Sequence, residues 1–206
     1  MSSSSVMGHS CIYIVAGPRS CGKSTFIKRC RAEQAAPHLP EEVSGLAKAA
    51  GPLYFMDLAN RYPDDSEELL VHVDLLTPFA DLSISSEQDL ATKIQARVFA
   101  EYPGVEWFRN CTQLKVLTLR VPRITALRRW LWRNAEQDRK SVPTVMAGLY
   151  SDAFGDEGYM TLYSAWDRYL AELPNVTSWD VSESPDGHSY SVVRAGVIVE
   201  DRDGAV

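Results

Sequence analysis

Residues 17–25 combine a lysine, two glycines and three hydroxyl side chains in a spacing that suits phosphate chemistry. Glycine lets the backbone take conformations in which successive N–H groups face one anion. Lys23 supplies a positive charge for the β- and γ-phosphates of a nucleotide, and the hydroxyl of Ser24 can ligate Mg²⁺. A site for a nucleoside triphosphate is therefore predicted. Its residues match the pattern G-x-x-x-x-G-K-[ST] at every specified position, and they are Gly17, Pro18, Arg19, Ser20, Cys21, Gly22, Lys23, Ser24 and Thr25.

The elements on both sides of this segment fit a phosphate-binding loop. Residues 11–16 are a short, apolar, β-branched run that indicates a buried strand. A helix is expected from Lys23 to about Ala35, and Pro37 and Pro40 stop it. Its first turn offers unpaired N–H groups and the positive end of its dipole to an anion. The alternative is a glycine turn before an ordinary helix, which the agreement of motif and context disfavours.

A second candidate group is the carboxylate of Asp74, which ends the largely apolar run 68–74. In phosphate-loop proteins a carboxylate at such a strand end faces the loop hydroxyl and holds the metal, directly or through water. We predict that Ser24 and Asp74 bind Mg²⁺, although a buried strand that merely ends in an acidic residue has the same pattern. His72 is expected to pack in the core rather than to act in catalysis.

Arginines follow the strand predicted at 114–121, on a helix that begins after Pro122. Arg129 and Arg133 are four residues apart and therefore share a helix face. They are predicted either to reach the transferring phosphate or to belong to a solvated basic face. This helix and the irregular, glycine-containing stretch after it make residues 122–160 a possible lid over the nucleotide, with a plain surface loop as the alternative.

Hydrophobic periodicity places the remaining elements. The helix after Pro122 is expected to bury a stripe formed by Ile124, Leu127 and Leu131. Asp57 is expected at the carboxyl end of a strand. The predicted segments are a short helix at 41–51, strands at 53–57 and 176–181, helices at 86–102 and 162–173, and a final strand or helix at 189–199.

The composition is that of an ordinary globular chain, with 45% hydrophobic and 23% charged residues. Its 206 residues suit one α/β domain at 11–206, after a small, polar tail at 1–10 that is expected to be disordered. A net charge of −6 argues against a nucleic-acid partner. No apolar run approaches the length of a membrane span, so no membrane partner is expected.

The cysteines do not form a metal-binding or disulfide pattern. They contain no C-x-x-C pair, so a zinc site is not expected and a reducing cytoplasm suits them. Cys21 lies inside the loop, where a small filler is favoured over an oxidation-sensitive thiol. The four cysteines are Cys11, Cys21, Cys30 and Cys111.

Taken together, the loop 17–25, the strand end 71–74 and the arginine-bearing helix resemble the small kinases of the P-loop nucleoside triphosphate hydrolase superfamily. The Gly-Pro that opens the loop is similar to that of guanylate and thymidylate kinases. The resemblance implies a three-layer α/β/α sandwich with a five-stranded, mainly parallel sheet of order 2-3-1-4-5, and a lid of arginines. The chain lacks the Asp-Arg pair that thymidylate kinases carry after the metal-binding strand, so the acceptor is not assigned.

The expected function is therefore an ATP-dependent kinase that transfers the γ-phosphoryl group to a small-molecule acceptor, as a monomer or homodimer. Lys23, Mg²⁺ and the arginines at 129 and 133 would neutralise developing charge, and Asp57 or Asp74 would accept the proton of the acceptor hydroxyl. A regulatory GTPase-like module is disfavoured because the chain contains no Asn-Lys-x-Asp motif. A sulfotransferase with a related loop is the third possibility.

Overall fold

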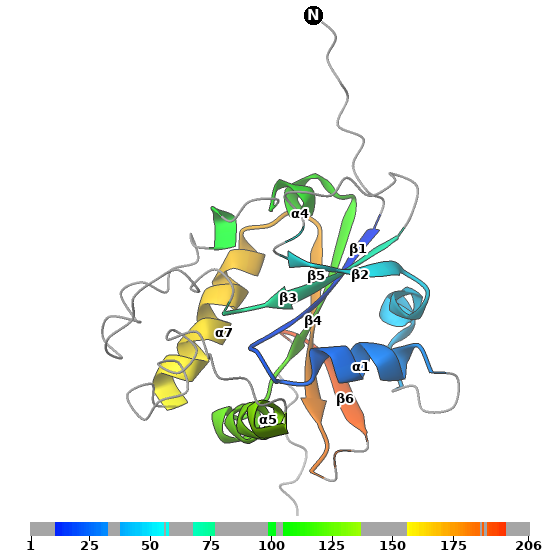
Figure 1. Cartoon of the computed structure of the whole chain (residues 1–206). Coiled ribbons are helices and arrows are strands. Elements are labelled where there is room, and N and C mark those ends of the chain that lie inside the picture. The colour runs from blue at the N-terminus through cyan, green and yellow to red at the C-terminus, as the bar shows by residue number, and fades with distance from the viewer. Residues whose placement is uncertain are drawn as a thin grey trace, which may run out of the picture.

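A six-stranded sheet forms the centre of the fold (Figure 1). The computed structural model describes residues 11–32, 38–55, 57, 68–76, 99–101, 105–136, 156–185, 187 and 189–196. The strands lie in the order β2-β3-β1-β4-β5-β6. Their bounds are Cys11–Gly17 for β1, Ala50–Tyr54 for β2, Leu69–Asp74 for β3, Gln113–Leu119 for β4, Val176–Glu183 for β5 and Tyr190–Arg194 for β6.

The predicted parallel order 2-3-1-4-5 is confirmed. The sheet is not five-stranded, however, because β6 adds a sixth strand antiparallel to β5. The two strands pair from Trp179 opposite Arg194 to Glu183 opposite Tyr190. This pairing extends β5 past the predicted end at residue 181, and it makes the last described segment a strand rather than a helix.

Helices cover both faces of the sheet and give the predicted three layers (Figure 1). On one face, α1 (Lys23–Cys30) and the 3-10 helix η1 (Glu41–Ala47) pack on a first apolar cluster. On the other face, α4 (Glu106–Asn110) and α7 (Asp156–Ala171) pack on a second cluster that is rich in aromatic rings. Successive side chains of β1 point to opposite faces of the sheet and so contribute to both clusters. Cys11, Tyr13 and Val15 belong to the first cluster, and Ile12, Ile14 and Ala16 belong to the second.

The helix α5 (Arg123–Glu136) follows β4, but it does not bury the predicted stripe. Ile124 and Leu131 are 51% and 52% exposed, whereas Ala126 is fully buried in the second cluster. Leu127 and Trp130 pack partly against the same cluster. Both Ile124, Leu127 and Leu131 and the set Ala126, Leu127 and Trp130 fit the helical period of this segment. Tertiary packing selects the second set.

The second predicted strand is wrong in its bounds. β2 starts at Ala50 and ends at Tyr54, because its pairing with β3 covers only this stretch. Asp57 therefore lies beyond the strand rather than at its carboxyl end. Most of the predicted helix at 86–102, the tail at 1–10, and residues 137–155 of the possible lid lie outside the described residues.

Side chains of α7 and β5 fix the carboxyl end of β4, from which α5 starts. The Tyr163 hydroxyl donates to the carbonyl oxygen of Leu119 at 2.8 Å and accepts from the N–H of Val121 at 3.3 Å. The Arg120 guanidinium donates to Asp180 at 2.7 Å and to both carboxylate oxygens of Asp167 at 2.7 and 2.9 Å. Hydrogen bonds to backbone and charged groups on both sides therefore set where α5 begins.

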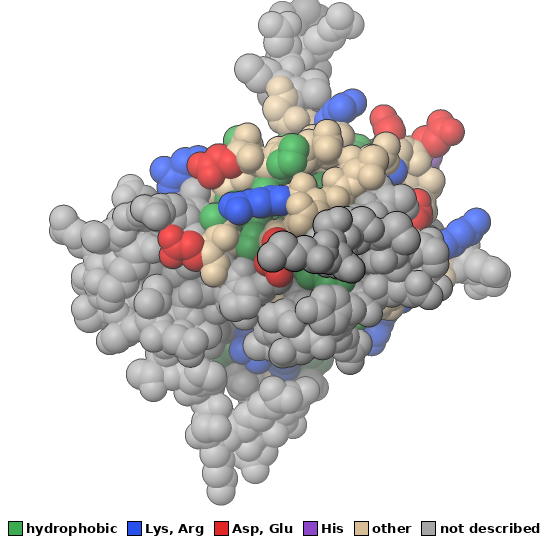
Figure 2. Space-filling view, turned by 90° about the horizontal axis from the view of Figure 1, so that it is seen from above, with side chains coloured by type: hydrophobic (Ala, Val, Ile, Leu, Met, Phe, Trp, Pro, Cys, Tyr) green, Lys and Arg blue, Asp and Glu red, His purple; other side chains and the backbone are tan. Residues whose placement is uncertain are grey.

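The described surface carries charges of both signs. On the face seen in Figure 2, Lys and Arg side chains lie among Asp and Glu side chains. Within the described part of the chain, no helix has the length and apolar character needed to cross a membrane.

We expect Tyr163→Phe to lower the free energy of unfolding by about 1–2 kcal/mol, because it removes two hydrogen bonds in a buried place. Tyr169→Phe is the matched control, since the buried Tyr169 hydroxyl has no hydrogen-bond partner among the described residues. Urea unfolding measures both variants. Equal stability of the two variants would contradict the anchoring role of Tyr163.

Candidate functional site

The predicted loop joins the end of β1 to the start of α1, and its two motif glycines are sterically required. Gly22 has a φ of 103°, a left-handed conformation that side chains resist. A Cβ on Gly17 would lie 2.6 Å from the Cys21 Sγ and 3.2 Å from the Leu119 carbonyl oxygen. Ser20 also has a positive φ, of 63°, an uncommon conformation that is concentrated at functional sites. The loop therefore folds tightly on itself against the end of β4.

The side chain of Lys23 is buried inside this turn, with 4% of its surface exposed. Its Nζ donates to the carbonyl oxygens of Gly17 and Pro18, both at 2.7 Å. No carboxylate of the described residues lies within ion-pair distance of this ammonium group. A buried charge needs compensation, and among the described residues it comes from two carbonyl dipoles and the Cys21 Sγ at 3.7 Å rather than from a carboxylate. The loop therefore carries a positive charge that an anion would complement.

Unpaired donors are present in the loop and at the start of α1. The Ser20 side chain is 7% exposed, and its hydroxyl oxygen has no hydrogen-bond partner among the described residues. The first N–H groups of α1 have no intrahelical acceptor, as in any helix, and they point out of its amino end. A buried hydroxyl without a partner costs free energy. Donors at the amino end of a helix are an arrangement that favours an anion.

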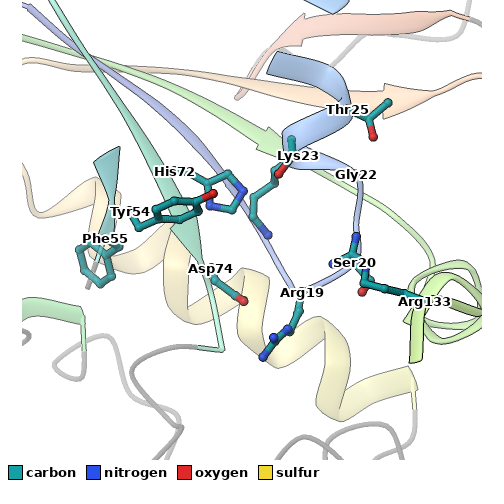
Figure 3. Close-up of a pocket in the computed structure, with 11 residues that line it drawn as sticks. Arg19, Ser20, Gly22, Lys23, Thr25, Tyr54, Phe55, His72, Asp74 and Arg133 are labelled. Carbon is teal, nitrogen blue, oxygen red and sulfur yellow. The ribbon is translucent and has the colours of Figure 1, made fainter. Parts of the chain in front are cut away.

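A cavity of about 360 Å³ opens beside the loop (Figure 3). Figure 3 shows residues of β2 and β3 on one side of it and loop residues on the other. Asp74 lines it, and the pairing of β3 with β1 places Asp74 opposite Gly17, where the loop begins. The N–H of Leu76 donates to the Asp74 Oδ1 at 3.1 Å and holds the carboxylate. The lining residues are Arg19, Ser20, Gly22, Lys23, Ser24, Thr25, Tyr54, Phe55, His72, Asp74 and Arg133.

Three of these residues were not predicted to line a site: Tyr54, Phe55 and His72, the last of which was expected in the core. His72 lines the cavity, with its ring centroid 5.2 Å from that of Tyr54. Burial and, secondarily, the charge of Lys23 lower the pKa of His72 to about 4, so the imidazole is neutral at pH 7. A usable signal was present, because residues two apart on a strand share a face, and His72 is two residues before Asp74.

The two predicted arginines lie on the loop side of α5 but have different surroundings. Arg133 lines the first cavity and also a second one of about 380 Å³. Arg129 lines only the second cavity, donates to the Cys21 carbonyl oxygen at 3.1 Å and forms an ion pair with Glu183. Asp57 lines neither cavity. The second cavity is lined by Ser20, Gly22, Thr25, Arg129, Trp132, Arg133, Glu183 and Tyr190.

Neither a scan against models of protein families nor a search of curated proteins finds a match to this sequence.

We expect all four thiols of the native protein to react slowly with a thiol reagent such as dithiodipyridine at pH 8. Each cysteine is buried, and burial raises the pKa of Cys21, of Cys30 to about 12 and of Cys111 to about 11. Because the thiolate is the reacting form, each rate should be at least about tenfold below that in denaturant. A fast thiol that peptide mapping assigns to Cys21 would instead support an oxidation-sensitive loop.

Proposed function

We propose that this chain is an ATP-dependent kinase of the P-loop superfamily that transfers the γ-phosphoryl group to the hydroxyl of a small molecule. The observation that carries the proposal is the buried ammonium group of Lys23, which has backbone carbonyls but no described carboxylate as partners. The same cavity is lined by Ser20, whose hydroxyl is unpaired among the described residues. A triphosphate supplies the negative charge and the acceptor oxygens that both groups need.

The two sides of the first cavity suggest how the reactants are arranged. The loop side, with Lys23, Ser20 and the amino end of α1, is basic and rich in N–H donors, and it suits the phosphates. The strand side carries the rings of Tyr54 and His72, and the His72 imidazole is neutral at pH 7, so this part of the cavity suits the acceptor. In parallel α/β sheets, ligands bind at the carboxyl ends of the strands, where both sides meet.

Ser24 and Asp74 both line this cavity and are suitable ligands for Mg²⁺. Mg²⁺ prefers oxygen ligands and is commonly held by one or two carboxylates together with substrate phosphates. When bound, the ion would neutralise charge on the phosphates. Of the two carboxylates considered from the sequence, Asp74 lines the cavity and Asp57 does not, so we assign Asp74 the role of receiving the proton of the acceptor.

In the proposed transfer, the acceptor oxygen forms a bond to the γ-phosphorus while the bond from this phosphorus to the bridging oxygen breaks. The electron pair of the broken bond leaves with the nucleoside diphosphate. Most of the catalysis in such a reaction comes from positioning and from neutralising charge. Lys23 and Arg133, which both line the cavity, are the cations of this chain proposed for that task.

A thermal-shift screen with ATP, GTP and a nucleotide sulfate donor, each with and without Mg²⁺, tests this function against its alternatives. Ligands raise the unfolding temperature of the state that they bind. We expect ATP to give the largest shift, and a larger one with Mg²⁺ than without it. A metal-independent shift by the sulfate donor would favour a sulfotransferase, and a shift by GTP alone would favour a regulatory GTPase.

We expect Lys23→Met to lower triphosphate affinity or turnover by at least about 100-fold, because it removes the buried charge but keeps the aliphatic stem. The loss of two hydrogen bonds should also lower the free energy of unfolding by about 1–2 kcal/mol. Lys28→Met is the matched control, since Lys28 lies exposed on the same helix. Steady-state turnover and urea unfolding measure the two effects. Equal turnover by the Lys23 variant and the parent would contradict the proposal.

We expect Asp74→Asn to weaken nucleotide binding at least about tenfold in the presence of Mg²⁺ and much less in its absence, since the carboxylate acts through the metal. Calorimetric titration with ATP, with Mg²⁺ or with a chelator, separates the two conditions. A parallel Asp57→Asn variant should retain the metal dependence of the parent. If the Asp74 variant lost affinity equally in both conditions, Asp74 would be a structural strand end.

A further inference from the structure

Arg129 reaches from α5 to the backbone of the phosphate loop. Its Nη1 donates to the carbonyl oxygen of Cys21 at 3.1 Å, and the same atom would lie 3.3 Å from a Cβ on Gly22. The guanidinium group therefore packs directly against the peptide bond between Cys21 and Gly22. The Nη2 of the same group forms an ion pair with the Glu183 carboxylate, so one planar group links the loop to the end of β5.

The bond to the Cys21 carbonyl also sets the direction of the Gly22 N–H. In a trans peptide the C=O and the N–H point to opposite sides of the chain. Because Arg129 binds the carbonyl from the side of the second cavity, the Gly22 N–H points away from Arg129. This N–H donates to no backbone carbonyl among the described residues. It is therefore available to a ligand in the loop.

Glycine itself does not hold this orientation. A residue without a Cβ takes left- and right-handed conformations at similar cost, so the peptide before Gly22 is free to turn unless a neighbour holds it. A peptide turned the other way would point a carbonyl oxygen, which repels phosphate, toward the anion. The contact from α5 prevents this by giving the carbonyl a charged donor on the outer side.

The second partner keeps Arg129 in this place. Glu183 is part-buried at the end of β5, and both the turn after it and the first residue of β6 contact α1. There Arg29 donates to the Gly187 carbonyl oxygen at 2.9 Å, and the Tyr190 ring packs edge-on against Phe26 at 5.0 Å. The charge of Arg129 is thus already compensated by a carboxylate. This distinguishes Arg129 from a cation that binds the ligand itself.

We propose that Arg129 is a positioning residue, which turns the Gly22 N–H toward the anion site by holding the Cys21 carbonyl against Glu183. The proposal rests on the proposed triphosphate site, and it replaces the direct phosphate contact that the sequence suggested for Arg129. Arg133, which lines both cavities, keeps that direct role.

Calorimetric titration with inorganic tripolyphosphate and Mg²⁺ at several salt concentrations tests the proposal. Arg129→Ala should weaken binding about 10- to 100-fold and leave the slope of log affinity against log salt unchanged, because no ligand-bound charge is lost. Arg133→Ala should make that slope shallower, because one cation that contacts the ligand is lost. Arg128→Ala is the matched control on the same helix and should bind as the parent does. Parent-like affinity of Arg129→Ala, or a shallower salt dependence of its affinity, would overturn the proposal.

The amide proton of Gly22 provides a direct readout by NMR. In the parent it should shift downfield when tripolyphosphate is added, as expected of an N–H that donates to an anion. Arg129→Ala should lose this shift even at saturating ligand. A full Gly22 shift in the variant would show that the peptide orientation does not depend on Arg129.

Glu183→Ala gives a second test, which also serves if Arg129→Ala does not fold. This change removes a negative charge from the rim of the site, so electrostatics alone predicts tighter anion binding. The positioning role predicts weaker binding, by about 3- to 30-fold, because Arg129 loses its anchor. Tighter or unchanged binding would overturn the proposal. If the parent binds neither tripolyphosphate nor ATP, the proposed function fails instead, whatever the variants do.

Discussion

The burial of an ammonium group inside the turn from β1 to α1 is the constraint on which the rest of the site depends. Lys23 is almost fully covered, and its Nζ is held by the carbonyl oxygens of Gly17 and Pro18. A turn this tight requires glycine where the Cys21 sulfur and the Leu119 carbonyl approach, and again at the left-handed Gly22. The loop therefore combines a buried positive charge with the amino end of a helix, an arrangement that favours anions.

The sheet brings other groups to this charge through its parallel register. β3 lies next to β1 and ends opposite Gly17, so Asp74 and His72 arrive at the edge where the loop begins. β4 lies on the other side of β1, and the contacts of Tyr163 and Arg120 fix its end, from which α5 starts. The carboxylate, the neutral imidazole and the arginines thus lie near one loop although they come from two separate segments of the chain, β3 and α5.

Features set by local sequence were predictable here. The loop has a defined motif, and β3 is a continuous apolar run that ends in Asp74, so both appear at the predicted positions. Features set by tertiary contacts were not. The partner of Arg129 is Glu183, which lies beyond the predicted end of β5 at residue 181. The buried side of α5 and the end of β2 likewise depend on neighbours that periodicity does not specify. His72 is an intermediate case, because its alternation with Asp74 is visible in the sequence but the cavity beside it is not.

The central claim is that the loop binds a triphosphate through the buried charge of Lys23. Calorimetric titration of the parent protein with MgATP, repeated on the Lys23→Met variant under the same conditions, tests it most directly. We predict a single binding site in the parent and no measurable heat of binding in the variant. Equal affinity of the two proteins, or no binding by a folded parent, would contradict the claim.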